Sequence, residues 1–310
     1  MVFAVLFILS SCAVVSPVPR KESLAYGRYL KGLLSDRSGQ NSEASDFFRQ
    51  VRSLDKEAVA PYWQLGFNYI RQKNYPKAVA EFEEVLRLAP DDTQARYVLA
   101  LLYTQLDYYK KAAGQYVYLL DNDAGDKVKE LQLRRILSQL YFLNKDFSLA
   151  QAQCAEILKV RPVDVWSLYM KATIDIEELR KPQGIKGLEE VLKYEPENSE
   201  AMNSLAYIYA EDGVELEKAL ILSEKAIDIE PGIGAYLDTA GWVYYKLGDF
   251  KTSIEYLKKA AAFEIDPVIF YHLGEAYFKN GMVREAKDAW SASLRLDPLQ
   301  KELRRKIKDL

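Results

Sequence analysis

The chain has 310 residues, of which 49% are hydrophobic, 12% aromatic and 28% charged, and its 22 tyrosines outnumber its 15 glycines. This apolar and aromatic content excludes an intrinsically disordered chain. The formal net charge of -3 argues against general binding to nucleic acid, which depends on concentrated Lys and Arg.

The first fifteen residues are almost all apolar. This run is shorter than the roughly 20 residues of a membrane-spanning helix, so it is predicted to be the apolar region of an export signal. Leu9-Ser10-Ser11-Cys12 resembles the lipobox of bacterial lipoproteins, in which cleavage leaves the cysteine as an N-terminus bearing fatty acyl chains such as palmitate. The resemblance implies a signal peptide over residues 1–11, lipidation of Cys12 and a tether over residues 12–24.

Two features of the first residues bear on whether the chain is exported and on which membrane it would reach. No Lys or Arg precedes the apolar run, so an ordinary cleaved signal and an uncleaved apolar start are the alternatives. Ala13 replaces the acidic residue that is associated with retention in the inner membrane, which favours the outer membrane, facing the periplasm.

After residue 24 a pattern recurs with a spacing of about 34 residues. Its last copy places an aromatic, a Leu-Gly pair and a tyrosine at i, i+3, i+4 and i+7, which is one face of a helix. A turn at residues 279–281 and a second helix follow, and a proline ends that helix. The residues of this copy are Phe270, Leu273, Gly274, Tyr277, Ala286, Trp290 and Pro298. Eight copies begin near Ala25, Val59, Thr93, Leu131, Val165, Ser199, Gly234 and Pro267.

This pattern resembles the tetratricopeptide repeat. The resemblance implies an all-α fold, a right-handed α-solenoid of eight helical hairpins, because one hairpin can bury its apolar faces only against its neighbours. A short helix over residues 301–310, with Leu303, Ile307 and Leu310 on one face, is predicted to cap the last repeat.

Departures from the pattern predict irregularities. A closing proline is missing and residues are added around Asp121–Asp126, which predicts a kink that separates repeats one to three (25–126) from repeats four to eight (127–300). The fifth repeat carries Lys171, Asp175 and Gly184 where apolar or small residues are usual, so its structure is the least certain of the eight.

Chemically reactive residues are few, and the sequence predicts no catalytic residue, metal site or cofactor. His272 is the only histidine and is expected to be a neutral residue of the surface or groove. Cys154 is expected to be a buried thiol. The acidic loop at Asp121–Asp126 lacks the glycine and the bidentate glutamate of a calcium-binding loop.

In proteins with this repeat, the first helix of each hairpin lines a concave groove. Transferring those positions by resemblance predicts an aromatic groove for a partner polypeptide, since aromatic rings supply contact area at low entropic cost. About half of these rings are expected to pack partly against neighbouring repeats. The predicted groove residues are Tyr29, Trp63, Phe67, Tyr97, Phe142, Trp166, Tyr169, Tyr207, Trp242, Tyr245, Tyr271 and Phe278.

The sequence therefore predicts a non-enzymatic scaffold of the bacterial cell envelope that binds another protein and assists the assembly or export of envelope components. It is expected to reach the membrane through its lipid and to bind neither nucleic acid nor a small-molecule substrate. The alternatives are a soluble cytoplasmic adaptor and an enzyme or accessory subunit with a site in the groove. Asp238, His272 and Glu275 would form such a site only if they converged in a dry pocket.

Overall fold

The structure, a computed structural model, describes residues 20–122 and 126–310. These residues form seventeen α-helices and no strand, as expected for eight hairpins and a capping helix. The predicted signal peptide (1–11) and Cys12 lie outside the described residues. None of the helices in the described ranges is long and apolar enough to cross a membrane.

The described chain forms two compact units, one ending at Lys145 and one beginning at Asp146. Unit 1 contains α1 (Arg20–Arg37), α2 (Asn41–Leu54), α3 (Ala60–Arg71), α4 (Tyr75–Leu88), α5 (Thr93–Gln105), α6 (Tyr109–Asn122) and α7 (Lys127–Leu143). Unit 2 contains α8 (Phe147–Val160), α9 (Val165–Glu177), α10 (Lys181–Tyr194), α11 (Ser199–Asp212), α12 (Leu216–Ile229), α13 (Gly234–Leu247), α14 (Phe250–Phe263), α15 (Pro267–Lys279), α16 (Val283–Leu296) and α17 (Lys301–Lys308).

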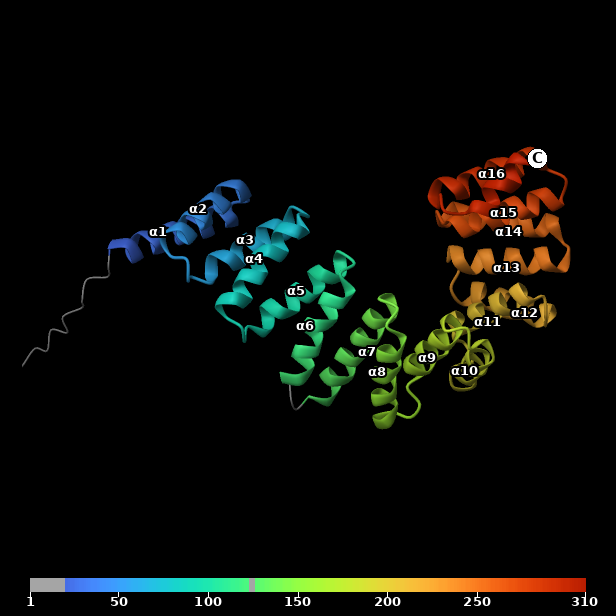
Figure 1. Cartoon of the computed structure of the whole chain (residues 1–310), viewed down its shortest axis with the longest axis horizontal. Coiled ribbons are helices and arrows are strands. Elements are labelled where there is room, and N and C mark those ends of the chain that lie inside the picture. The colour runs from blue at the N-terminus through green and yellow to red at the C-terminus, as the bar shows by residue number, and fades with distance from the viewer. Residues whose placement is uncertain (1–19, 123–125) are drawn as a thin grey trace, which may run out of the picture. The chain divides into compact units, whose positions relative to one another are not determined.

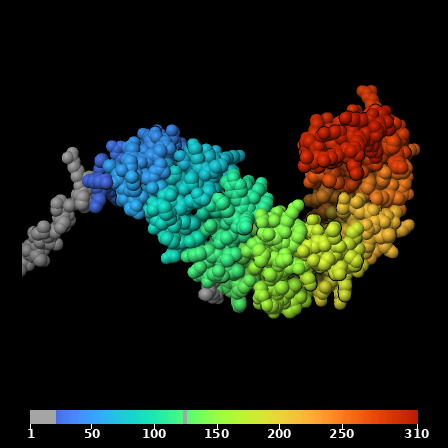
Figure 2. All heavy atoms as spheres, in the orientation of Figure 1, coloured from blue at the N-terminus to red at the C-terminus, as the bar shows by residue number. Residues whose placement is uncertain are grey.

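Within each unit, a helix packs against its hairpin partner and against the next hairpin in the chain. In unit 2, for example, α13 pairs with α14, α15 pairs with α16, and α14 contacts α15 (Figure 1). Figure 2 shows side chains filling the space between these successive ribbons. The buried apolar residues therefore form a row of small cores, as a stack of repeats requires.

Small residues in the first helix of a hairpin leave space into which large side chains of the second helix pack. A Cβ added at Gly66 would lie 2.6 Å from the Phe82 ring, and one added at Gly274 would lie 2.3 Å from the Trp290 ring. Both aromatic side chains are completely buried. The predicted close approach of the two helices at Gly274 is therefore observed.

Each hairpin turn places one residue in the left-handed region of the Ramachandran plot just after its first helix, eight in all, and the α11–α12 turn adds a further one, Glu215. Only four of these eight residues are glycines, although an L side chain at positive φ is strained. The turns are closed by backbone hydrogen bonds such as that from Met282 N to the Tyr277 carbonyl, at 2.9 Å. The eight residues are Gly39, Lys73, Asp107, Lys145, Leu179, Gly213, Gly248 and Gly281.

Tyrosines join neighbouring repeats. The Tyr244 hydroxyl on α13 donates a hydrogen bond of 2.8 Å to Glu224 on α12. The Tyr103 hydroxyl on α5 donates one of 2.5 Å to Glu83 on α4. Burial first, and then the hydrogen bond to the carboxylate, raises the pKa of both phenols, because both effects disfavour phenolate. Some of the many tyrosines thus hold neighbouring repeats together.

The ends and irregular positions differ in detail from the expectations. α1 begins at Arg20, inside the predicted tether, since residues 20–24 include no proline or glycine that would stop a helix. α17 ends at Lys308; Leu303 is buried against Ala286 and Trp290, whereas Leu310 lies beyond the helix and is exposed.

The fifth repeat folds as a hairpin, α9 and α10, in spite of its unusual residues. Asp175 is tolerated there because Arg180 donates hydrogen bonds of 2.9 and 2.6 Å to it. The predicted kink at Asp121–Asp126 stays a prediction, because residues 123–125 are outside the described part of the chain; α6 and α7 on either side of this loop pack together.

Candidate partner-binding surfaces

Three of the predicted groove residues converge in unit 1. Trp63 and Phe67 of α3 and Tyr97 of α5 line a pocket of about 410 Å³. Phe67 is 39% exposed and Tyr97 is 44% exposed, so both rings are available to a partner. Val98 and Leu133 extend the apolar wall to α7. Three of the twelve predicted groove residues thus line one pocket, and the groove as a binding surface stays a prediction.

The repeat packing sets the orientation of the two rings on α3. Phe82 enters the space that Gly66 leaves open, and Trp63 and Phe67 stand edge-on to the Phe82 ring at centroid distances of 5.0 and 5.6 Å. Trp63 Nε1 also donates a hydrogen bond of 3.2 Å to Asp92. The indole therefore keeps its position in the pocket wall in the absence of a ligand.

Tyr97 is held in a similar way. Its ring meets the buried ring of Tyr116 edge-on, at a centroid distance of 5.9 Å. Sequence reasoning did not name Phe82 or Tyr116 as supports of the pocket. Their spacing of 16 residues from Gly66 and Ala100 is the signal that could have identified them, because Gly32 with Phe48 and Gly274 with Trp290 pair at the same spacing.

The other predicted groove residues of unit 1 do not line this pocket. Tyr29 is half-buried, and its ring packs against Phe48 at a centroid distance of 5.7 Å. Phe142 on α7 is also half-buried.

In unit 2, aromatic rings form a stacked column. The Tyr245 and Trp242 rings are 4.5 Å apart and nearly parallel, and Trp242 stacks in turn on His272 at 4.0 Å. Trp242 is buried, and its Nε1 donates a hydrogen bond of 2.5 Å to Glu211. Trp242, which the sequence predicts to contact a partner, is thus buried and supports the rings stacked on it. Tyr245 is partly exposed.

The expectation that His272 lies on the surface or in the groove is wrong. It is 3% exposed, and its Nδ1 lies 3.0 Å from each carboxylate oxygen of Asp238, which is also buried. The ring stacks on Trp242, and the carboxylate supplies the polar partner that a buried imidazole needs. The pair therefore has a clear packing role.

Glu275 does not join this pair. Its carboxylate binds Lys306 of α17 instead, and the Lys306 ammonium lies 4.5 Å from the Trp290 ring centroid. The three residues considered for a hidden catalytic site therefore do not converge. Cys154, as expected, is fully buried.

The remaining predicted residues of unit 2 are all half-buried. Tyr169 exchanges a hydrogen bond of 3.2 Å with Ser204 on α11, Phe278 packs against Trp290 at 5.5 Å, and Trp166 lies at the start of α9. Tyr207 and Tyr271 are on the first helices of their repeats. Burial first, and then neighbouring carboxylates, raises the pKa of each of these two phenols to about 12.

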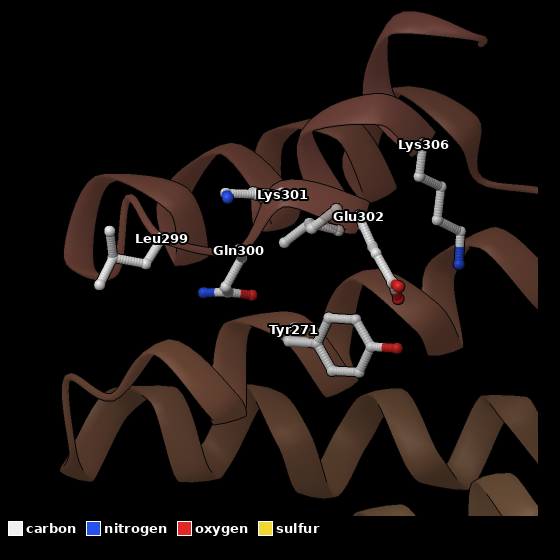
Figure 3. Close-up of a pocket in the computed structure, with 7 residues that line it drawn as sticks. Tyr271, Leu299, Gln300, Lys301, Glu302 and Lys306 are labelled. Atoms are coloured by element: carbon white, nitrogen blue, oxygen red, sulfur yellow. The ribbon is translucent and has the colours of Figure 1, made fainter.

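Tyr271 also lines a pocket of about 600 Å³ beneath α17. Figure 3 shows Glu302 and Lys306 reaching from α17 toward the hydroxyl end of the Tyr271 ring, while Leu299 and Gln300 lie toward its other end. The lining is mixed in charge. This surface differs in chemistry from the apolar pocket of unit 1.

The tetratricopeptide repeat family matches residues 59–92 and 235–264. These stretches correspond to the hairpin α3–α4 and to nearly all of α13–α14. The chain contains tetratricopeptide repeats. The other hairpins share with these two a left-handed residue in the turn.

A tetratricopeptide repeat-containing protein of Pseudomonas aeruginosa is 30% identical over 145 residues, which make up 47% of this chain and 25% of that protein. The chain spans a quarter or less of the length of the curated relatives it matches. Among solved structures, yeast Tom70 aligns with a TM-score of 0.57 and 15% identity, covering 92% of this chain and 63% of Tom70. A tetratricopeptide repeat protein of Parabacteroides merdae aligns with a TM-score of 0.50 and 13% identity, covering 92% and 98%.

These structural likenesses show the fold of nearly the whole described chain. Stacks of this repeat are generally non-catalytic scaffolds for interactions between proteins. The exposed rings of the unit 1 pocket are consistent with that general role.

Proposed function

We propose that the chain is a non-enzymatic scaffold of the bacterial cell envelope that binds a partner polypeptide in the aromatic pocket of unit 1. The observation that carries this proposal is the convergence of Trp63, Phe67 and Tyr97 on about 410 Å³ of mainly apolar space. Rigid rings that are exposed lose little conformational entropy when a partner binds, and their apolar surface is then buried away from water. An extended or helical segment with one or two apolar anchors fits this surface.

The envelope location rests on sequence. Residues 1–15 have the apolar character of an export signal, and Cys12 follows Leu9-Ser10-Ser11 as in bacterial lipoproteins. A lipid on Cys12 would hold the repeats at the periplasmic side of the outer membrane, where they would assist the assembly or export of envelope components.

The binding test compares the full chain with the variant Phe67→Ala/Tyr97→Ala. Both rings are more than a third exposed, so their removal leaves the buried support of Phe82 and Tyr116 in place. Partners recovered from envelope extract by the wild type are identified and purified, and their Kd is then measured for each variant. Removing the two anchors is expected to weaken the Kd by roughly tenfold or more.

Tyr108→Ala is the matched control. Tyr108 is in the same unit, is 53% exposed and lies outside the pocket. An equal loss in this control, or unchanged binding in the double variant, would contradict the pocket as the binding surface.

The anchor is tested separately with Cys12→Ala. The wild type is expected to fractionate with the outer membrane and to incorporate a labelled fatty acid, and the variant is expected to lose the label. Wild-type protein that stays unlabelled would refute the lipid anchor and leave the binding proposal standing.

A further inference from the structure

Unit 2 contains a second, smaller pocket whose lining is rich in hydrogen-bond acceptors. It has a volume of about 240 Å³ and lies between the middle of α11, the first half of α13 and the segment that joins α14 to α15. Its lining includes Asn203, Tyr207, Asp238, Glu264, Asp266 and Ile269. No Lys or Arg is among the described residues that line it.

Three carboxylates line this pocket at separate points. Asp238 is 6% exposed, and His272 Nδ1 is its hydrogen-bond partner on the protein side. Asp266 accepts a hydrogen bond of 2.7 Å from Val268 N at the start of α15. Glu264 lies against the first residue of α13, since a Cβ added at Gly234 would be 2.7 Å from Glu264 Oε2. Among the ion pairs of the described residues, none includes Glu264 or Asp266.

Among the uncharged groups of the pocket, one buried acceptor stands without a donor. Asn203 Oδ1 is buried and has no hydrogen-bond partner among the described residues. The Thr239 hydroxyl proton is committed to the Ala235 carbonyl at 3.0 Å. A buried acceptor without a donor costs free energy, so a ligand that brings several N–H donors gains by filling this space.

The walls add to the preference for a cation. The ring of Tyr207 forms one side of the pocket. Burial is the main cause that raises the pKa of this phenol to about 12, and the neighbouring carboxylates of Glu211 and Asp238 raise it further, which is the part that reflects negative local charge. Pockets for drug-sized ligands measure about 300–1,000 Å³, so this smaller one suits a single side chain.

The same recognition already occurs within the chain. Lys306 sets its ammonium on the Glu275 carboxylate and over the Trp290 ring at 4.5 Å. Lys246 lies over the Trp242 ring at 4.9 Å and donates a hydrogen bond of 3.3 Å to the Glu211 carbonyl. In both cases an aromatic face and an oxygen acceptor together hold a lysine.

We propose that the pocket of Asn203, Tyr207, Asp238, Glu264 and Asp266 receives a lysine or arginine side chain of a partner polypeptide. Charge complementarity selects this occupant, because the pocket presents carboxylates and an unpaired amide oxygen to a group that has only donors. The inference rests on the proposed function, to which it adds a basic anchor in unit 2 beside the apolar anchors in unit 1.

The test uses three fluorescent twelve-residue peptides: (Gly-Ser-Lys)₄, (Gly-Ser-Arg)₄ and (Gly-Ser-norleucine)₄. Norleucine keeps an apolar stem and removes the ammonium. Binding to the full chain is measured by fluorescence anisotropy at low salt. We expect the two basic peptides to bind about tenfold more tightly than the norleucine peptide, since the cation meets more than one carboxylate and each charged contact contributes up to about fivefold.

The pocket is probed with Glu264→Gln/Asp266→Asn. Gln is isosteric with Glu, and Asn preserves the helix cap at position 266. This variant is expected to weaken binding of the basic peptides by about tenfold, which corresponds to two lost charged contacts. Glu255→Gln, an exposed residue of α14 outside the pocket, makes the same kind of charge change and should leave binding unaltered.

The outcomes separate this inference from the proposed function. Equal binding of the norleucine peptide, or basic peptides that bind the pocket variant as well as the wild type, overturns the cationic pocket but leaves the unit 1 surface untouched. A wild-type dimer that Glu264→Lys converts to a monomer would identify a second copy of the chain as the occupant and would also overturn the proposal.

Discussion

At the scale of single residues, a contact between a glycine and a buried ring organises the hairpins α1–α2, α3–α4 and α15–α16. The contact between Gly274 and Trp290 is the shortest of these. A Cβ added at Gly274 would lie 2.3 Å from the indole, and Trp290 is fully buried. A fully buried indole between helices has little room to move, so overpacking there strains the hairpin α15–α16.

Gly274→Ala is therefore expected to lower the free energy of unfolding by about 1–3 kcal/mol. The measurement is urea denaturation followed by circular dichroism. Alanine is normally the better helix former, so the predicted loss has the opposite sign to intrinsic helix propensity.

Gly114→Ala in α6 provides the control. No heavy atom lies within 4 Å of the added Cβ at this exposed position, so the substitution should stabilise the chain by up to about 1 kcal/mol. If Gly274→Ala and Gly114→Ala both raised the free energy of unfolding, the close contact at Gly274 would not limit the size of the residue there.

Sequence reasoning found Gly274 but misplaced His272. The Leu-Gly spacing reports local helix packing, which sequence periodicity encodes directly. The burial of His272 depends on Trp242 and Asp238, which are on α13 of the preceding repeat. Such partners are set by the stacking of one repeat on the next, and the pattern within one repeat does not contain that information.

At the scale of the hairpin, the turn between two helices requires one left-handed residue. Four of the eight turns use a residue other than glycine, among them Leu179, which has φ of 60° and is 91% exposed. A side chain in this region costs roughly 1–2 kcal/mol, and an exposed leucine recovers little of that cost through packing.

Leu179→Gly is expected to raise the free energy of unfolding by about 0.5–1 kcal/mol, after the greater flexibility of glycine in the unfolded chain is subtracted. The reciprocal change, Gly248→Leu at a φ of 85°, should lower it by a similar amount. The urea midpoints of the two variants measure both effects. A Leu179→Gly variant with a lower midpoint than the wild type would show that the turn is not strained.

The helices themselves were predictable, since eight hairpins and a capping helix follow from periodicity and from the closing prolines. The positions of the ends were less predictable. α1 starts at Arg20 because residues 20–24 can adopt helix as readily as a tether, and local propensity does not distinguish the two states without their packing. Leu310 likewise fits the apolar face of a helix that in fact ends at Lys308.

At the scale of the whole molecule, the many tyrosines link stability to alkaline pH. Burial raises the pKa of Tyr116 in unit 1, and of Tyr207 and Tyr271 in unit 2, from the ordinary value of 10 to about 12. Between these values the unfolded chain has lost phenolic protons that the folded chain still holds. The unfolded state then binds fewer protons, so stability falls as pH rises from 10 to about 12.

Urea titrations across that pH window are expected to show this decline, and the triple variant Tyr116→Phe/Tyr207→Phe/Tyr271→Phe should show a shallower one. The comparison with the variant removes the contribution of lysines, which titrate in the same range. A decline of equal steepness in both proteins would mean that these three phenols ionise as freely when folded as when unfolded.

At three junctions a hydrogen bond from tyrosine to glutamate connects a repeat to the one before it at the same separation of 20 residues: Tyr103 with Glu83, Tyr209 with Glu189 and Tyr244 with Glu224. Excision of the whole repeat from Ser199 to Ile233 would bring Tyr244 into register with Glu189 and recreate the same bond between new neighbours. Duplication of a repeat would do the same. A gene that encodes such a chain can therefore lose or gain this repeat as a whole module while the hydrogen bond at the junction is kept.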